Sequence, residues 1–124
     1  MSVEFDPTRP IYLQIMERVK QGAVRGEHAA GEQLTSVRDM AAAMGVNPNT
    51  MARAYQELER EGFVETRRGE GSFITADSAR IDAERQCLAA AAQHRFIHEV
   101  RELGLTPAQI SALLTQIDRE IEVT

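Results

Sequence analysis

Two helical patterns separated by only about three residues place the tightest constraint on what this chain can fold into. Ser36 precedes one apolar stripe, which ends at Gly45, and Asn47 with Pro48 precedes a second stripe, which ends at Gly62. Ser, Asn and Pro favour helix starts, whereas a glycine after the stripe is typical of a left-handed helix end. We therefore expect two helices that meet across a tight turn, and the rest of the fold must be built around this pair.

The segments on either side of this pair supply the other parts of a small domain. An apolar stripe at helical spacing follows Pro10 and ends near Gly26, which predicts a first helix. Residues 63–66 and 72–75 are two β-prone runs, and the stretch between them is rich in glycine and arginine, which predicts a hairpin. Helix, tight turn, helix and hairpin follow in the order of a winged helix-turn-helix, so we assign residues 1–75 to such a domain.

Residues 76–124 are rich in alanine and carry two further helical patterns. Two helices cannot close a core alone, because each would leave the apolar stripe of the other half in water. We therefore predict a two-helix dimerisation element whose stripes gain burial only between two chains of a homodimer. The expected dimer residues are Leu88, Phe96, Val100, Leu103, Ile110, Leu113, Leu114, Ile117 and Ile121. The expected fold class is mainly α with a small β-hairpin, an N-terminal winged helix-turn-helix followed by this C-terminal element.

The second helix of a helix-turn-helix enters the major groove of DNA, so its polar side is where base-reading residues are expected. Asparagine can pair with adenine, arginine with guanine, and threonine with a phosphate or a thymine methyl group. Arginines beside glycines at a hairpin tip can approach a minor groove or its phosphates closely. The start of the preceding helix also favours a phosphate. The candidate DNA-binding residues are Ser36, Arg38, Asn47, Asn49, Thr50, Arg53, Arg67, Arg68, Gly69 and Gly71.

Each candidate also has a simpler interpretation. For Asn47 a purely structural role as a helix cap is as plausible as base reading. For Asn49 a purely structural role in the turn is less plausible than base reading. A lone arginine is more often solvated surface than a base reader. Gly69 and Gly71 suit a plain hairpin turn, and Tyr55 suits packing better than phosphate contact. The order and spacing of the whole set therefore carry the prediction, rather than any one member.

The charge balance of the chain runs against DNA binding, because affinity for phosphate groups comes from Lys and Arg. The net charge is −5, residues 1–75 carry nine basic and eleven acidic side chains, and residues 76–124 carry five and eight. The local field at a binding face can nevertheless differ in sign from the net charge. Acidic residues gather at positions 57–65, beyond the expected reading surface, so we expect the basic residues to dominate that surface.

Residues 31–74 resemble the DNA-binding domain of the GntR family of bacterial regulators. The family's pattern of Leu-Pro-Ser-x-Arg, Leu-Gly-Val, Thr-Val, Leu-Glu, Gly-Leu-Val and Arg-x-Gly-x-Gly corresponds to Leu34, Ser36, Arg38, Met44, Gly45, Val46, Thr50, Met51, Leu58, Glu59, Gly62, Phe63, Val64, Arg67, Gly69 and Gly71. The Asn-Pro-Asn-Thr run and the short helical tail are similar to the YtrA subfamily in particular. Thr35 replaces the usual proline, and Pro48 and Ala52 stand where many relatives carry base-reading arginines. Base reading is therefore expected to fall to Asn47, Asn49, Thr50 and Arg53.

The resemblance implies a regulator of transporter genes, and the leading hypothesis is a repressor that occludes a promoter by binding a palindromic double-stranded DNA operator. Larger relatives bind metabolites or metals in effector domains, but this tail is too short for an enclosed pocket of several hundred Å³. Any small-molecule effector site is therefore expected between subunits. His94 and His98 stand one helical turn apart without a third ligand, so we predict no metal site and no cofactor.

Length and composition exclude other classes of protein. A chain of 124 residues is too short for a Rossmann sheet or a barrel, and it lacks a nucleophile–base pair or phosphate loop, so we do not expect an enzyme. No apolar run approaches the roughly 20 residues of a membrane span, and no secretory signal is evident, which favours the cytoplasm. The alternative function is a winged-helix protein-interaction module that does not bind DNA, and the arginines of the hairpin argue against it.

Overall fold

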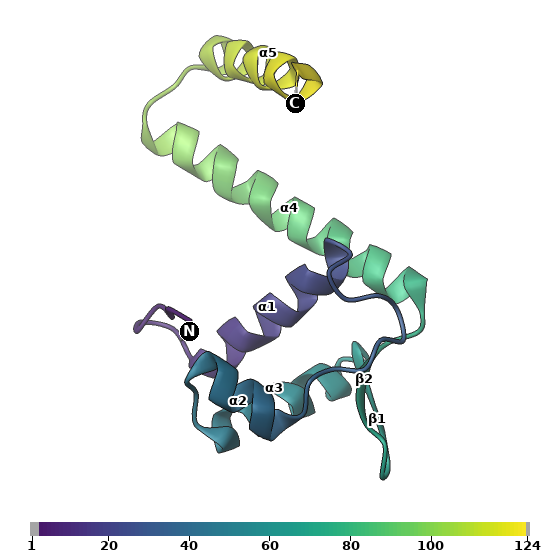
Figure 1. Cartoon of the computed structure of the whole chain (residues 1–124). Coiled ribbons are helices and arrows are strands. Elements are labelled where there is room, and N and C mark those ends of the chain that lie inside the picture. The colour runs from purple at the N-terminus through teal and green to yellow at the C-terminus, as the bar shows by residue number, and fades with distance from the viewer. Residues whose placement is uncertain (1–2, 124) are drawn as a thin grey trace. The chain divides into compact units, whose positions relative to one another are not determined.

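The computed structural model describes residues 3–123, which form five helices and one two-stranded sheet (Figure 1). In chain order the elements are α1 Ile11–Val24, α2 Val37–Met44, α3 Pro48–Arg60, β1 Val64–Arg67, β2 Gly71–Ile74, α4 Ser78–Glu102 and α5 Pro107–Val123. The expected fold class is confirmed, since the chain is mainly helical with a winged helix-turn-helix followed by C-terminal helices. No helix within residues 3–123 is long and apolar enough to cross a membrane. Two compact units, Met1–Arg85 and Gln86–Thr124, divide the chain within α4.

The helix-turn-helix is formed by α2 and α3, and local capping sets the ends that face the turn. The Ser36 hydroxyl accepts a hydrogen bond from the Asp39 backbone N–H at 3.2 Å, which begins α2. Gly45 ends α2 with a φ of 69°, in the left-handed region that favours glycine. The Asn47 side-chain oxygen accepts from the Asn49 backbone N–H at 2.8 Å and begins α3. Three residues separate the two helices, as the sequence predicts.

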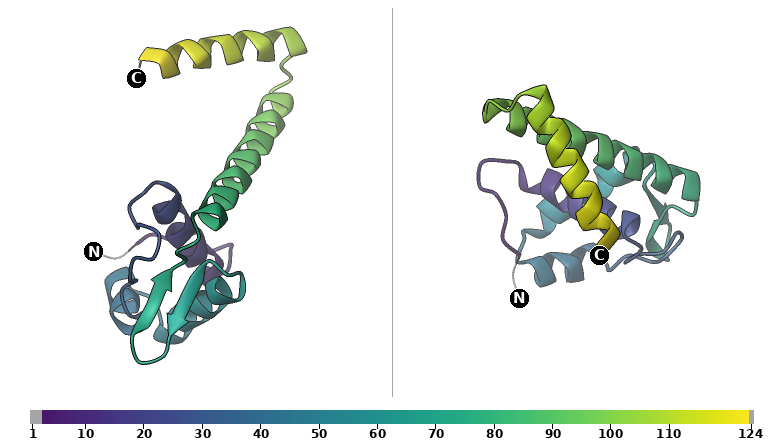
Figure 2. Two further views of the ribbon diagram at one scale, coloured as in Figure 1. Left: turned by 90° about the vertical axis from the view of Figure 1, so that its right-hand side faces the viewer. Right: turned by 90° about the horizontal axis from the view of Figure 1, so that it is seen from above.

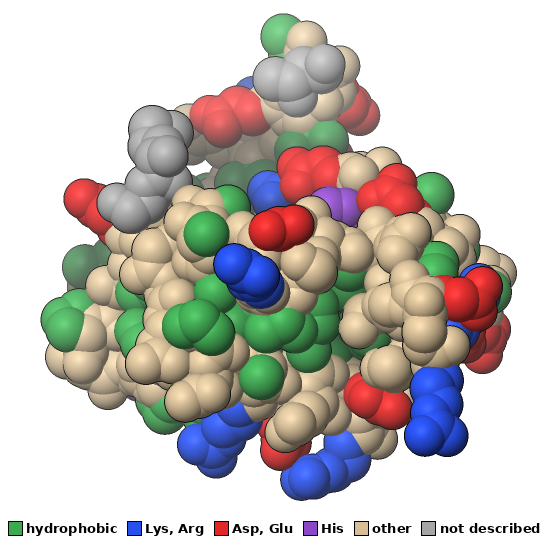
Figure 3. Space-filling view, turned by 60° about the horizontal axis from the view of Figure 1, so that its bottom comes forward, with side chains coloured by type: hydrophobic (Ala, Val, Ile, Leu, Met, Phe, Trp, Pro, Cys, Tyr) green, Lys and Arg blue, Asp and Glu red, His purple; other side chains and the backbone are tan. Residues whose placement is uncertain are grey.

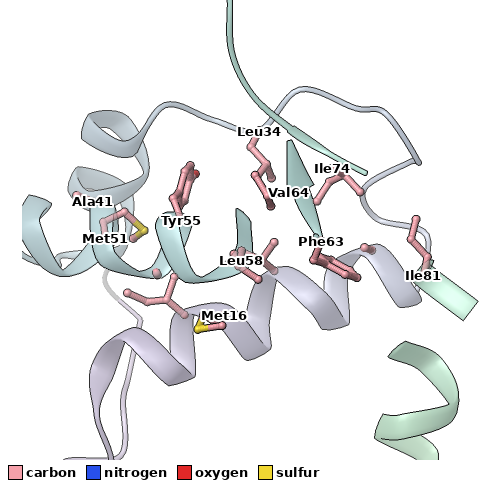
Figure 4. Packing of buried hydrophobic residues seen from close by; sticks show 14 residues of the cluster. Met16, Leu34, Ala41, Met51, Tyr55, Leu58, Phe63, Val64, Ile74 and Ile81 are labelled. Atoms are coloured by element: carbon pink, nitrogen blue, oxygen red, sulfur yellow. The ribbon is translucent and has the colours of Figure 1, made fainter. Parts of the chain in front are cut away.

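The core of the first unit lies between α1, α3 and the hairpin, and α2 and the start of α4 complete it (Figure 4). The largest side chains that are fully withdrawn from solvent are Phe63, Ile15, Met51, Leu58, Ile74 and Val64. Burial of one such side chain is worth about 1.5–3 kcal/mol. Because every member of this cluster precedes Gln86, the first unit has the core of an independent domain.

The hairpin pairs β1 and β2 in antiparallel register, with Val64 opposite Ile74 (Figure 2, left). Both strands lie one residue nearer to the tip than the sequence predicts. On the β1 side the reason is that Phe63 takes part in the cap that follows α3, since its backbone N–H donates to the Leu58 carbonyl at 3.0 Å and Gly62 adopts a φ of 75°. The strand therefore begins only after this helix end is complete.

A short extended segment before α2 pairs with the other edge of β2, which the sequence patterning does not predict. Gln33 forms an antiparallel bridge with Phe73, and the Leu34 backbone N–H donates to the Ser72 carbonyl at 2.8 Å. Leu34 is buried in the core at this point. The segment that leads into the helix-turn-helix is therefore attached to the hairpin through the backbone.

The first turns of α4 pack on the first unit. Ile81 is buried in its core. A Glu84 carboxylate oxygen lies 3.5 Å from the Lys20 ammonium and 3.2 Å from the Arg80 guanidinium. The Arg85 guanidinium donates to the last carbonyl of α1 at 2.9 Å. These contacts explain why the first unit extends to Arg85 rather than ending with the hairpin.

The second unit consists of the rest of α4 and α5, joined by a short turn. Gly104 in this turn has a φ of 76°. Thr106 and Gln109 form a reciprocal cap at the start of α5, since the Gln109 N–H donates to the Thr106 hydroxyl at 3.3 Å and the Thr106 N–H donates to the Gln109 side-chain oxygen at 2.9 Å. A capping box therefore begins α5.

Candidate nucleic-acid interface

The N-terminal half of α3 presents a polar face to solvent. Asn49 and Arg53 stand one turn apart and are exposed, and Thr50 beside them is half-buried. The opposite side of the helix is fixed in the core through Met51 and Ala54, which are fully buried. Within residues 3–123, the Asn49 and Arg53 side chains make no hydrogen bond or ion pair to the protein. Their donors and acceptors are therefore available to a ligand. The helix that carries them is held in one orientation by its buried side.

Two of the candidate residues are engaged as helix caps. The side-chain oxygens of Ser36 and Asn47 accept the backbone hydrogen bonds that begin α2 and α3. Arg38 in the first turn of α2 is exposed and has no acidic partner in the described part of the chain. Ser36 and Asn47 therefore serve as the N-caps of α2 and α3. The side-chain amide nitrogen of Asn47 remains available to a ligand.

The hairpin of β1 and β2 is the wing of the winged helix-turn-helix. Its tip is a four-residue turn that exposes two arginines. The Glu70 backbone N–H donates to the Arg67 carbonyl at 2.9 Å, and Gly69 adopts a φ of 79° that favours glycine. The Arg67 guanidinium lies over the Phe73 ring, 4.1 Å from its centroid. Arg68 is exposed and makes no ion pair with any residue from 3 to 123. Of the two cations, Arg68 is the one whose charge is fully available.

The wing is braced by a side chain from outside the hairpin. The Gln33 amide nitrogen donates to the Glu70 carbonyl at 2.8 Å. Gly71 has a φ of 118°, and a Cβ built at this position would lie 2.9 Å from the same Gln33 nitrogen. A side chain at position 71 would strain the backbone and displace the Gln33 amide, so the glycine is required by the brace as well as by the turn.

Four acidic side chains near the interface are engaged by other groups of the chain, whereas Asp39 and Glu70 make no side-chain hydrogen bond or ion pair within residues 3–123. The pairs are Glu57 with Arg60, Glu59 with Thr66, Glu61 with Lys20, and Glu65 with Arg67. By contrast, Arg38, Arg53 and Arg68 have no acidic partner within residues 3–123. Figure 3 shows Lys and Arg side chains set along the lower edge of this face, with acidic side chains between some of them. The interface therefore offers unpaired positive charge despite the net charge of −5.

Tyr55 lies beneath the interface and not in it. Its side chain is buried, and its hydroxyl donates to the Thr35 carbonyl at 2.6 Å. Burial raises the pKa of Tyr55 to about 12, so the hydroxyl remains a protonated donor at neutral pH. Tyr55 ties α3 to the residue before the Ser36 cap, which agrees with the packing role that its position in the apolar stripe predicts.

A tyrosine that was not among the predicted residues lies at the same face. The Arg53 guanidinium carbon is 3.8 Å from the centroid of the Tyr12 ring. Tyr12, Pro10 and Ile11 line a shallow hollow together with Asn49, Thr50 and Arg53. The sequence predicts no candidate in α1, because its apolar stripe indicates a helix that packs in the core. A tyrosine at the edge of that stripe, with one apolar side and one polar tip, was the available signal.

Comparison with known proteins assigns this architecture to a family. Residues 11–74 match the family model described as bacterial regulatory proteins, gntR family. Over 89% of its length the chain is 42% identical to the HTH-type transcriptional regulator YhcF of Bacillus subtilis, and the match covers 91% of that protein. The chain belongs to the GntR family. As a GntR-family regulator it is a DNA-binding transcriptional regulator and not an enzyme, so the alternative of a module that does not bind DNA is set aside.

Two further relatives agree with this assignment. The HTH-type transcriptional repressor YtrA of Bacillus subtilis is 42% identical over 61% of this chain and 60% of its own. The solved structure of a GntR family transcriptional regulator from Listeria monocytogenes is 38% identical, with a TM-score of 0.82 over 90% of this chain and 98% of the other. The resemblance to the GntR family and its small YtrA-like members is therefore confirmed.

The expected dimer residues of this GntR-family chain differ widely in exposure. Val100 is buried in the single chain, and its part in a dimer stays a prediction. The half-buried members are Leu88, Phe96, Ile110, Leu113 and Ile117. Leu103 is 75% exposed, Leu114 54% and Ile121 66%. Among its described residues α5 buries no side chain, which leaves most of its apolar stripe in contact with solvent.

The second unit contains a hollow that the sequence analysis did not expect. Phe96, Ile97, Ile110 and Leu114 line an apolar recess of about 500 Å³ between α4 and α5. Its volume is in the range of several hundred Å³, but the recess is open to solvent and not an enclosed pocket. His98, one of the two histidines considered as metal ligands, is exposed, and residues 3–123 contain no group of three or more side chains that could hold a metal.

Proposed function

We propose that this GntR-family regulator binds a palindromic operator as a homodimer and represses transcription by occluding a promoter. The observation that carries the proposal is the set of unpartnered donors on one rigid unit, Asn49 and Arg53 on α3 and Arg68 on the wing. Asn49 is suited to adenine and Arg53 to guanine in the major groove. Arg68 is suited to phosphates or to the minor groove. Asn47 and Thr50 are proposed to share the base reading. The residues proposed to position the protein on the DNA backbone are Ser36, Arg38, Arg67, Gly69 and Gly71.

The homodimer is proposed from the unsatisfied apolar surface of residues 76–124. Leu103 and Leu114 are large apolar side chains that are more than half exposed. A second copy of the same helices would remove them from water, and a two-fold dimer would match a two-fold operator. We propose that residues 1–75, with the first turns of α4, form the DNA-reading domain and that the rest of the chain forms the dimer. An effector, if one acts on this protein, is expected at the dimer interface.

The repressor role rests on likeness and on a simple physical requirement. YtrA, one of the relatives, is named a transcriptional repressor. Repression by occlusion needs only a dimer that stays bound at the promoter, and a DNA-reading domain with a dimerisation element supplies that. From the likeness to the YtrA subfamily we further propose that the regulated genes include transporter genes. Such a regulator would act in the cytoplasm, where bacterial DNA lies.

The test is to titrate the full-length protein against random duplex at low and moderate salt, and to select duplexes from a randomised library. We expect binding that weakens steeply with salt and an enriched inverted repeat whose half-sites lie about one helical turn apart. Binding without salt dependence and without an enriched sequence would contradict operator recognition. Enrichment of an isolated half-site would contradict the dimer and leave operator recognition standing.

A further inference from the structure

We infer that Tyr12 is a positioning residue for base recognition, because its ring holds the Arg53 guanidinium on the polar face of α3. The inference rests on the proposed function of that face and adds α1 to an interface otherwise made of the helix-turn-helix and the wing. The Arg53 guanidinium carbon lies 3.8 Å from the ring centroid. Cation–π attraction extends to about 6 Å, so this is a close contact at stacking distance.

The contact with Tyr12 leaves the hydrogen-bonding capacity of Arg53 intact. Cation–π attraction uses the flat face of the guanidinium, whereas its N–H donors point outward in the plane of the group. Within residues 3–123 the Tyr12 ring is the only recorded partner of this guanidinium. The two donors needed for a bidentate contact with the O6 and N7 atoms of guanine therefore remain free.

The helix start that carries Tyr12 is anchored by hydrogen bonds. Tyr12 lies in the first turn of α1, and the segment that leads into this turn is locked by the buried side chain of Gln14. The Gln14 amide nitrogen donates to the carbonyls of Asp6 at 2.8 Å and Arg9 at 3.0 Å, and its oxygen accepts from the Asp6 N–H at 2.8 Å. These hydrogen bonds tie the first turn of α1 to the segment that precedes it.

The helices that carry the ring and the guanidinium share one core. Ile15 of α1 and Met51 of α3 are both fully buried in it. The ring and the guanidinium thus meet without any movement of the backbone, and the arginine is preorganised before DNA arrives. Preorganisation lowers the entropy cost of binding, because a held side chain has less rotamer freedom to lose.

The test uses the full-length protein, the tightest duplex that it selects from a randomised library, and a random duplex. The variants are Tyr12→Leu, Tyr12→Phe, Arg53→Ala and the Tyr12→Leu, Arg53→Ala double variant. We expect Tyr12→Leu to bind the selected duplex roughly two- to fivefold more weakly, the size of an exposed cation–π contact. It should relax base preference at the same base pair as Arg53→Ala. Tyr12→Phe should behave like the wild type, and Tyr12→Leu should add nothing to Arg53→Ala.

Four results would overturn the inference. Equal weakening of selected and random duplex by Tyr12→Leu, or an undiminished effect of Tyr12→Leu in the Arg53→Ala background, would show that Tyr12 acts independently of the arginine. A loss in Tyr12→Phe as large as in Tyr12→Leu would assign the effect to the hydroxyl. An unchanged base preference in Arg53→Ala would remove the inference and leave the proposed function intact. A wild-type protein that selects no duplex would instead remove the proposed function.

Discussion

The two units of this chain carry apolar stripes of similar appearance in the sequence, but they bury them differently. In the first unit the stripes of α1 and α3 meet in one cluster with the hairpin and are withdrawn from water. In the second unit Val100 is the one buried apolar side chain among the described residues, while Leu103 and Leu114 remain largely exposed. An amphipathic pattern therefore predicts that one face of a helix will be buried. Whether the same chain buries that face depends on how many other helices and strands the unit contains.

The comparison implies a division of roles between a unit that folds alone and a unit that needs a partner. The first unit combines helices and a hairpin, so its stripes can be covered from several sides. The second unit has only two helices, and the apolar recess between α4 and α5 shows that they do not fill the space between them.

Truncation after Arg85 should have the largest effect on operator binding. The first unit keeps Ile81 and Glu84 in place and should stay folded, but it loses the proposed dimerisation element. Linking two half-site readers can raise affinity by roughly 10²- to 10⁴-fold, so we expect a loss of that order on an inverted-repeat duplex. Sedimentation and titration measure the two effects. Leu114→Asp in the full chain should mimic the truncation, and a truncated chain that still dimerises would refute the assignment of roles.

Leu58→Ala should destabilise the first unit strongly. Leu58 is fully buried in the core, so the variant leaves a cavity and should lower the free energy of unfolding by about 2–5 kcal/mol. Urea denaturation at a fixed protein concentration measures this. The matched control is Leu114→Ala, which removes the same atoms from an exposed position and should leave the unfolding of the first unit unchanged. Similar losses of unfolding free energy in Leu58→Ala and Leu114→Ala would contradict the difference in burial between the two units.

Asn49→Ala should weaken binding to the selected operator by about 1–3 kcal/mol and relax preference at one base pair of each half-site. The reason is that the Asn49 side chain is exposed on α3 and makes no hydrogen bond within residues 3–123. Titration against operator variants and random duplex measures both effects. An equal loss on random duplex would show that Asn49 is not a base-reading residue.

Arg68→Ala should act on all DNA sequences alike. A wing arginine that contacts phosphates weakens specific and random binding together and reduces the slope of log affinity against log salt by about one. The matched control is Arg25→Ala, because Arg25 is an exposed arginine paired with Glu27 at 3.5 Å, outside the predicted interface. Titration over a salt series compares the two. A slope that is the same in Arg68→Ala and wild type would exclude the wing from DNA contact.

Tyr55→Phe should change how stability depends on pH. Burial raises the pKa of Tyr55 to about 12, whereas an unfolded tyrosine titrates near about 10. The neutral phenol therefore stabilises the fold fully below about pH 10, and this contribution is lost as the pH rises toward about 12. The stability difference between wild type and Tyr55→Phe should narrow over that window. A constant difference in unfolding experiments across the same pH values would contradict the buried, protonated hydroxyl.

Features that depend on a few neighbouring residues could be predicted from the sequence. The ends of α2 and α3 follow from Ser36, Gly45 and Asn47, because capping is a local interaction between a side chain and the next turn. The order of helix, turn, helix and hairpin and the polar face of α3 follow from the same kind of pattern. Most of the candidate interface therefore follows from local sequence patterns.

Features that depend on distant segments could not be predicted in the same way. The bridge between Gln33 and Phe73 joins segments that carry no pairing pattern, since one of them is only a short extended stretch before a helix. The contact between Tyr12 and Arg53 exists only because α1 and α3 cross in the core. Likewise, no local pattern distinguishes the start of α4, which packs on the first unit, from the rest of the same helix.

The hydrogen bond from Gln33 to the wing has a consequence for the heat and entropy of DNA binding. A free hairpin tip would lose backbone freedom when it meets DNA, at a cost of about 1–2 kcal/mol for each residue that becomes ordered. Here the tip is held at Glu70 by a residue that lies just before α2, so much of that ordering takes place when the protein folds. Calorimetry should therefore show a smaller unfavourable entropy for the wild-type protein than for a Gln33→Ala variant, whose wing must be ordered by the DNA itself.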